Sequence, residues 1–363
     1  MHDLPKVADL PQDFTATAIR NWEFILEAEA LAKASHRRNE PKSGDRLVAT
    51  RVVGFFLLDL WTHQQRPCYL TAYSSFYNEI TSCRAEAQLE RAYEKLWELG
   101  LLYRNHLFRV SPTESEHPSR SSFERMRQDL MAAMRNAPVT NVDARKQALF
   151  RDGYACTLTG IFNLSSIPKI QWLGPHIMAV GGQTGLVQCA HIFSESAQES
   201  TQTQDKTNYA ASALAILEKF GMNSEMLLGT NVHRTFNTIS MSAALHGLFD
   251  TLHFWFEEDV NAEPNTYNVV TMDPYPIAFL PARVTFTVDP HALADCATQG
   301  IPVPSLPSPT LLAIHAACCR VAHLSGAAEQ ADQILHDLET TQVLAEDGGS
   351  SHLLMSRLLQ VVA

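Results

Sequence analysis

The chain has 363 residues, of which 45% are hydrophobic and 18% are charged. This composition is that of an ordinary folded protein, which excludes a disordered or fibrous chain, and the length predicts two or three packed units. The formal net charge of −11 counts against a surface devoted to nucleic-acid backbones, because such proteins usually present a basic face.

The seven cysteines are odd in number and include no C-x-x-C pair. They predict a chain kept in a reducing compartment and without a zinc site of the C-x-x-C kind. Residues 1–5 lack the basic and apolar regions of a secretory signal. The most apolar stretch, 52–61, is shorter than the about 20 residues of a membrane span and predicts a buried helix. We therefore expect an intracellular protein, cytoplasmic or nuclear, with no membrane segment.

The first region, residues 1–137, is predicted to be mostly helical. Apolar residues recur at three-to-four spacing over four segments, at 17–34, 47–61, 85–101 and 122–135. The polar run at 111–119 predicts a loop or linker. Basic residues then gather over 120–151, just ahead of the motif described below, as a phosphate track or, more commonly, as a solvated helix face: Arg120, Arg125, Arg127, Arg135, Arg145, Lys146 and Arg151.

Residues 138–275 change in character, because short strand-like segments alternate with turns and helices. The predicted elements are a helix at 144–150, a turn at 151–154, strands at 155–160 and 185–193, a polar excursion at 194–207, a helix at 209–220, a strand at 238–241, a helix at 243–250 capped by Ser242, and strands at 253–257 and 267–272. This order predicts a small sheet with one helix following its second strand.

A proline-rich stretch at 274–309, which we expect to wrap the surface, leads from the central region into the last region, residues 276–363. Helices are predicted at 311–324, 327–344 and 353–362. We expect one compact α+β body in which helices from both ends of the chain flank the small sheet.

Three residues of the central region suggest a chemistry. His191 ends a predicted strand, Asn237 precedes the next one, and His246 lies on the helix that follows. A neutral imidazole can take a proton from water near pH 7, and a second imidazole can hold a divalent metal against a phosphate. Asp250 lies four residues after His246, on the same helical face, so its carboxylate can share that ion.

Three segments carry a family resemblance: RDGYACTLTG at 151–160, QCAHIF at 188–193, and 237–250 with its Asn237, His246 and Phe249-Asp250. They resemble the HNH-type nuclease domains found in many fungal proteins, over about 144–258 and more loosely from Leu306. The resemblance implies an α+β fold with a ββα-metal core. It implies His191 as general base, Asn237 as the residue that ties down the loop and orients that base, and His246 as a ligand of Mg²⁺ or Mn²⁺, with Zn²⁺ as another choice.

Two departures from the HNH pattern keep other functions open. HNH enzymes commonly place a metal-binding aspartate or histidine immediately before the base, where this chain has Ala190, and the gap from His191 to Asn237 is long. Asp250 or Glu195 would then have to supply the missing ligand. A metal-dependent endonuclease acting on nucleic acid is the first hypothesis. The alternatives are an HNH-derived enzyme of secondary metabolism with a small-molecule substrate in a buried pocket, and a non-catalytic HNH-fold protein.

Each residue also has a purely structural interpretation. His191 in a strand is commonly a hydrogen-bonded core histidine, Asn237 is at home in a turn, and Asp250 can close a helix end. His233, four residues before Asn237, is as readily a loop residue as a ligand. Other catalytic motifs, such as G-x-S-x-G, H-E-x-x-H and a phosphate-binding glycine loop, are not found in the sequence.

Overall fold

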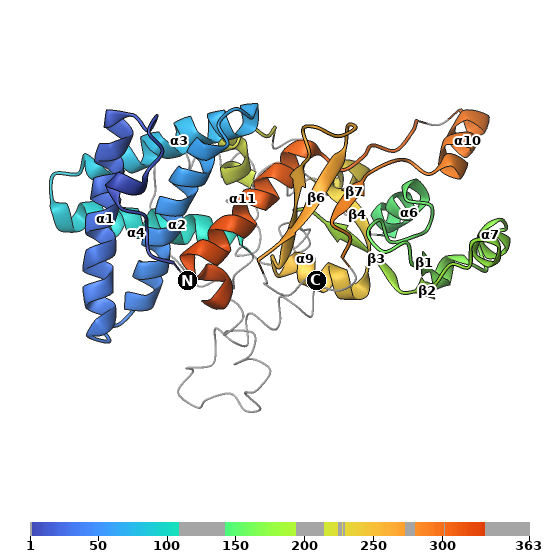
Figure 1. Ribbon diagram of the computed structural model, residues 1–363, viewed down its shortest axis with the longest axis horizontal. Helices are drawn as coiled ribbons and strands as arrows, with labels where there is room; N and C mark the ends of the chain where they lie inside the picture. The colour runs from blue at the N-terminus through green and yellow to red at the C-terminus, as the bar shows by residue number, and fades with distance from the viewer. Residues whose placement is uncertain are drawn as a thin grey trace. The chain divides into compact units, whose positions relative to one another are not determined.

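The computed structural model describes residues 2–108, 142–193, 214–223, 227, 229–272, 280–300 and 302–330. Contacts divide the chain into two compact units, as the length predicted, and the expectation of one compact body was wrong. The helical unit comprises Met1–Arg135, Ser196–Ser224 and Ala317–Ala363, and the mixed unit comprises Asn136–Glu195 and Glu225–Ala316. Figure 1 labels their helices and strands.

The helical unit is built on four helices: α1 (Ala16–Arg37), α2 (Ser43–Thr62), α3 (Pro67–Arg84) and α4 (Leu89–Leu107). Thr15 caps α1 by accepting the N–H of Ala18, and Pro67 starts α3 at a position where its missing N–H costs nothing. The apolar stretch at 52–61 lies within α2, whose residues 47–57 are all buried, as predicted. None of the helices in the described ranges is long and apolar enough to cross a membrane.

Close backbone packing and a buried ion pair hold this unit together. Gly100 of α4 lies against the backbone of Ala49 in α2, and a Cβ at residue 100 would overlap the Ala49 carbonyl oxygen. Arg320, near the end of α11 (Pro309–Ser325), binds both carboxylate oxygens of Asp59 at 2.6 and 2.9 Å. The two side chains are largely buried, so this pair is screened little by solvent.

In its described residues, the mixed unit contains three small sheets and several short helices. Its elements in chain order are α6 (Val142–Arg151), β1 (Phe162–Asn163), α7 (Leu173–Val180), β2 (Thr184–Gly185), β3 (Val187–His191), η5 (Gly229–His233), η6 (Thr235–Asn237), β4 (Thr238–Ser242), α9 (Ala243–Asp250), β5 (Phe254–Glu258), β6 (Thr266–Thr271), β7 (Arg283–Thr285) and α10 (Pro290–Gln299). Strands β1 and β2 pair in parallel, β3 pairs antiparallel with β4, and β5, β6 and β7 form an antiparallel sheet.

The β3–β4 pair and α9 place the residues of the HNH pattern. The register sets His191 opposite Thr238 and Val187 opposite Ser242, and α9 begins directly after β4 and packs on both strands. Residues alternate between the two faces of a strand, so Gln188 and Ala190 share one face while Cys189 and His191 share the other. His191 on β3, Asn237 at the end of η6 just before β4, and His246 on α9 therefore follow in the predicted order.

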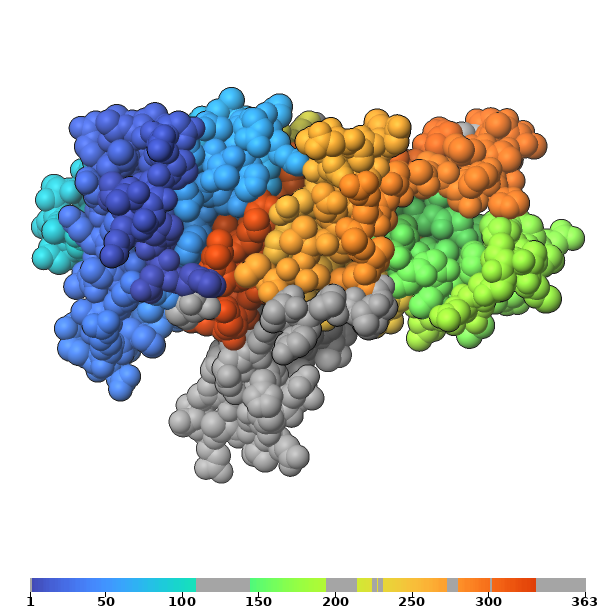
Figure 2. Space-filling view, in the orientation of Figure 1, coloured from blue at the N-terminus to red at the C-terminus, as the bar shows by residue number. Residues whose placement is uncertain are grey.

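Segments far apart in the sequence meet at the surface of the mixed unit. The rings of Trp172 and His291 stack with centroids 3.9 Å apart, and the light-green and orange segments that carry them lie side by side in Figure 2. Asp289 starts α10 by accepting the N–H groups of His291 and Ala292, while its own N–H donates to the Arg151 carbonyl. These contacts fix α10 against the end of α6 and the segment before α7.

Most of the predicted elements are confirmed, with changes of a few residues at their ends. The helix at 243–250 and the strand at 238–241 correspond to α9 and β4, and the mixed helical and strand content fits the predicted α+β class. Ser242 is the N-cap residue of α9, but its side chain makes no capping hydrogen bond. The predicted strand at 185–193 is β2 followed by β3.

Some predictions were wrong. Residues 155–160 do not form a strand: Ala155 makes a single bridge to Phe162, and the Gly160 N–H donates to the Cys156 carbonyl across a turn in which Gly160 has φ +69°. The segment at 274–309 contains β7 and α10 and does not simply wrap the surface, and α3 and α7 were not predicted. The loop at 111–119, the helices at 122–135 and 353–362, and Glu195 lie outside the described residues.

Candidate active site

Asn237 joins three segments of the mixed unit through its side chain. Its amide nitrogen donates to the carbonyls of Phe193 and Val232, each at 2.9 Å, and its Oδ1 accepts the Phe193 N–H at 3.0 Å. The Asn237 carbonyl also accepts the N–H of Ile192. Because Asn237 is fully buried, these bonds are not in competition with water. They fix the chain that follows His191 against the loop that carries Val232.

His191 lies next to a second histidine. The His191 Nε2 is 3.3 Å from the Nδ1 of His233, and the two rings meet edge to face with centroids 5.4 Å apart. Both residues are buried, with 8% and 5% of their surface exposed. His233 ends η5 and is adjacent to Val232, which Asn237 binds. Asn237 therefore fixes the chain beside both imidazoles.

His246 and Asp250 form a second group, on α9. The Nε2 of His246 is 3.2 Å from Oδ2 of Asp250, and the other ring nitrogen, Nδ1, is 2.8 Å from Oε1 of Gln188 in β3. The side chains of His246 and Asp250 are partly exposed. An acceptor at Nδ1 fixes the proton on that nitrogen, which leaves Nε2 to bind a metal or, when protonated, the carboxylate.

Gln188 contacts His246 from the strand that carries Ala190. Ala190, at the position where HNH enzymes commonly carry a metal ligand, is fully buried and has no ligand atom. Gln188 lies two residues earlier on the same face of β3, and it contacts His246. The sequence pattern did not single out Gln188, although the alternation of a strand places it beside Ala190.

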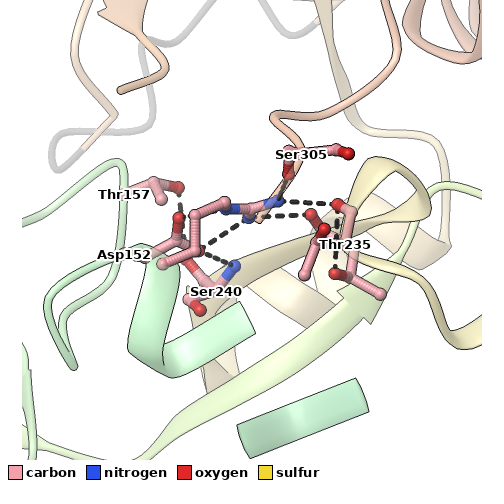
Figure 3. A network of polar contacts seen from close by, with 7 residues as sticks. Asp152, Thr157, Thr235, Ser240 and Ser305 are labelled. Carbon is pink, nitrogen blue, oxygen red and sulfur yellow. Dashed lines mark hydrogen bonds and ion pairs between the residues drawn. The ribbon is translucent and has the colours of Figure 1, made fainter. Parts of the chain in front are cut away.

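Arg151 lies at the centre of a buried hydrogen-bond network next to Asn237. Its guanidinium donates to both oxygens of Asp152 at 2.6 and 2.8 Å, and to the carbonyls of Thr235, Thr238 and Ser305 at 2.6, 2.9 and 3.1 Å. Figure 3 shows this network, with Asp152, Thr235 and Ser305 labelled. The five N–H groups of the guanidinium thus have five acceptors. Two of these carbonyls belong to Thr235 and Thr238, which flank Asn237 in the sequence.

The predicted basic stretch is only partly described, and two of its members bind the protein itself. The sequence suggested that Arg151 belongs to a phosphate track or to a solvated helix face. Both interpretations were wrong for this residue, because Arg151 is fully buried. Arg145 donates to the carbonyl of Val187 in β3. Asp152 also accepts the N–H of Ser240 at 3.1 Å, so α6 is bonded to both strands of the β3–β4 pair.

The turn after Arg151 is shaped by residues with left-handed backbone. Gly153 has φ +63° and Tyr154 has φ +61°, and a Cβ on residue 153 would overlap the carboxylate of Asp289. Burial raises the pKa of the Tyr154 hydroxyl, and the nearby carboxylates of Asp295 and Asp289 raise it further. The turn brings Arg151 and Asp152 to β4.

The donor atoms of His246 and Asp250 suit a divalent ion that keeps most of its water. Two ligands each about 2.1 Å from one ion lie at most about 4.2 Å apart, and these two atoms are 3.2 Å apart. Over the described ranges, no group of three or more His, Cys, Asp or Glu side chains is placed to hold a metal. Mg²⁺ commonly binds through one or two carboxylates, water and substrate phosphate, so the pair fits Mg²⁺ or Mn²⁺ better than a structural Zn²⁺.

Comparison with known families agrees with the geometry. Residues 156–257 match the family model of HNH endonucleases, a range that includes His191, His233, Asn237, His246 and Asp250. This match supports an HNH-type nuclease domain over these residues and a nuclease-type function in general. No curated protein and no solved structure matches the chain.

Proposed function

We propose that the chain is a metal-dependent endonuclease that hydrolyses phosphodiester bonds with His191 as the general base. The observation that carries this proposal is the arrangement of two groups within the segment matched by HNH endonucleases. His191 is held beside His233 and the side chain of Asn237, and His246 is paired with Asp250 on the helix that follows β4. Strands β3 and β4 connect the two groups.

Each residue has a separate task in this mechanism. His191 takes a proton from the attacking water, which a neutral imidazole can do. Asn237 holds the backbone next to His191. His246 and Asp250 would hold the divalent ion, and Gln188 would orient His246. When bound, that ion would stabilise the charge that develops on the phosphate oxygens.

Nucleic acid is the substrate class that this activity implies. Because the net charge of the chain is −11, we expect the contacts to its phosphates to be confined to the surroundings of the site. Phosphate binding would then depend on the bound cation and on few basic side chains. We expect weak, salt-sensitive binding and cleavage with little sequence preference.

The test is a plasmid-nicking assay with the full chain. We expect conversion of supercoiled to nicked DNA in Mg²⁺ or Mn²⁺, loss of this conversion with EDTA, and a loss of at least about 100-fold in His191→Ala. His253→Ala is a matched control, because His253 pairs with Thr251 outside the proposed site. Nicking that persists in His191→Ala contradicts the proposal.

A second candidate is an HNH-derived enzyme that acts on a small molecule. It is favoured by the burial of His191 and His233, since a polymer cannot reach a base that is 8% exposed unless the surrounding chain moves. If the wild-type chain binds Mn²⁺ but nicks neither DNA nor RNA, while His191→Ala changes the binding of a small phosphodiester such as bis(p-nitrophenyl) phosphate, this candidate replaces the first.

A further inference from the structure

We infer that His233 is a positioning residue that fixes the tautomer of His191, with the proton on Nε2 of His191 and the acceptor on Nδ1 of His233. This inference rests on the proposed function both for the direction of the hydrogen bond and for its consequence in catalysis. Its structural content, a defined hydrogen bond between two buried imidazoles, can be tested independently of any activity.

The geometry defines which nitrogens are involved. The Nε2 of His191 and the Nδ1 of His233 are 3.3 Å apart, and ring centroids 5.4 Å apart place these two nitrogens between the rings. A neutral imidazole has one N–H and one lone pair, so one of the two nitrogens must donate and the other accept. Two donors would face each other if both rings were protonated, which the burial of the pair disfavours.

The general-base role proposed for His191 selects the direction of this bond, since the contact itself allows either nitrogen to donate. In this direction His233 carries its own proton on Nε2, a buried nitrogen. If His191 donated from Nδ1 and accepted at Nε2, its lone pair would be used by His233, and the ring could not take a proton without breaking the bond. If Nε2 of His191 carries the proton instead, the lone pair on Nδ1 is the base. The bond to His233 then persists when His191 becomes an imidazolium. The acceptor stabilises that cation, as an aspartate does in a serine protease triad.

Asn237 extends this role to the backbone. Its side chain binds the carbonyl of Val232, next to His233, and both backbone groups of Phe193, two residues after His191. The two imidazoles are 42 residues apart in the sequence, so this clamp keeps two distant segments at hydrogen-bonding distance. His233 therefore aligns the ring of His191, and Asn237 aligns the two segments that carry the rings.

The test is imidazole NMR on the metal-free full chain labelled with ¹⁵N-histidine. His191 is assigned by the signals that disappear in His191→Gln. We expect a pyrrole-type shift at its Nε2 and a pyridine-type shift at its Nδ1 near neutral pH. His233→Asn, which can present an amide oxygen at the position of Nδ1, should keep this pattern. In His233→Leu the His191 ring should exchange between its two tautomers, so the signals of its Nδ1 and Nε2 should shift toward averaged values. His253→Leu should leave both His191 signals unchanged.

A pyridine-type shift at Nε2 of His191 in the wild-type chain overturns the inference. So does a folded His233→Leu variant in which His191 keeps the same tautomer as in the wild type. If His233→Leu does not fold, the wild-type and His233→Asn spectra still decide. Activity gives a second readout: nicking should fall about 10- to 100-fold in kcat in His233→Leu, with KM little changed, and recover largely in His233→Asn. Absence of nicking in the wild type would reject the endonuclease proposal but would leave the NMR result intact.

Discussion

Asp250 lies one helical turn after His246, and its Oδ2 is 3.2 Å from the His246 Nε2. Both side chains remain partly exposed, so the pair contributes little to stability, about 0.3 to 0.5 kcal/mol for exposed helix pairs of this spacing. In the proposed function, these two atoms share a divalent ion as their ligand. The first prediction concerns this ligand.

Asp250→Asn should weaken Mn²⁺ binding by at least about 10-fold, because the amide lacks the negative charge that a hard divalent cation prefers. The fold should be unaffected, since the residue is partly exposed. Isothermal titration calorimetry of the full chain with Mn²⁺ measures this affinity. Asp295→Asn, an exposed acid on α10, is the matched control and should bind as the wild type does. Equal affinities of Asp250→Asn and the wild type would remove Asp250 from the site.

Gln188→Ala should weaken the same Mn²⁺ binding by about 10-fold, as substitutions of residues that orient metal-binding histidines commonly do. The Gln188 Oε1 is 2.8 Å from Nδ1 of His246, so its loss frees the imidazole to rotate and to change tautomer. Gln188→Glu keeps the acceptor and should retain most of the affinity. A Gln188→Ala variant that binds as tightly as the wild type would show that His246 is oriented by α9 alone.

The local elements of the site were predictable because their signals are local. The period of apolar residues and the N-cap position of Ser242 predicted α9 from the sequence, and the spacing of His246 and Asp250 on one helical face predicted their contact. The strand alternation of β3 would also have singled out Gln188 once Ala190 was seen to lack a ligand atom. The roles of His191, Asn237, His246 and Asp250 remain predictions.

The parts of the site that were missed depend on pairing across long distances. His233 is 42 residues from His191 and lies in a short 3-10 segment without a periodic pattern, so no local signal connects the two. Arg151 was interpreted as one member of a basic run, because a sequence does not show that Thr235, Thr238 and Ser305 bring their carbonyls around it. The glycine turn at 160 produced an apparent strand where the chain reverses.

Arg151→Met should destabilise the chain by about 3 to 5 kcal/mol, because it leaves Asp152 buried without its charged partner and takes a donor from each of three carbonyls. Urea unfolding of the full chain measures this change. Arg38→Met is the matched control, since Arg38 pairs with Glu40 at an exposed position, and its effect should stay within about 0.5 kcal/mol. Similar unfolding midpoints for both variants would show that the Arg151 network contributes little.

Two glycines in helices should respond oppositely to alanine, because only one of them has room for a Cβ. Gly100→Ala should destabilise the chain by at least about 1 to 3 kcal/mol, since the added Cβ overlaps the backbone of Ala49 and α2 and α4 must move apart. Gly247→Ala should stabilise α9 by about 0.5 to 1 kcal/mol, because no atom lies within 4 Å of the new Cβ and alanine favours the helix. Thermal unfolding measures both changes.

Gly247 is exposed and follows His246, so the nicking rate of the stabilised variant is also informative. An unchanged rate is expected if substrate approaches the metal ligands from the side of Asp250, and a large loss would mean that the backbone at Gly247 itself contacts the substrate.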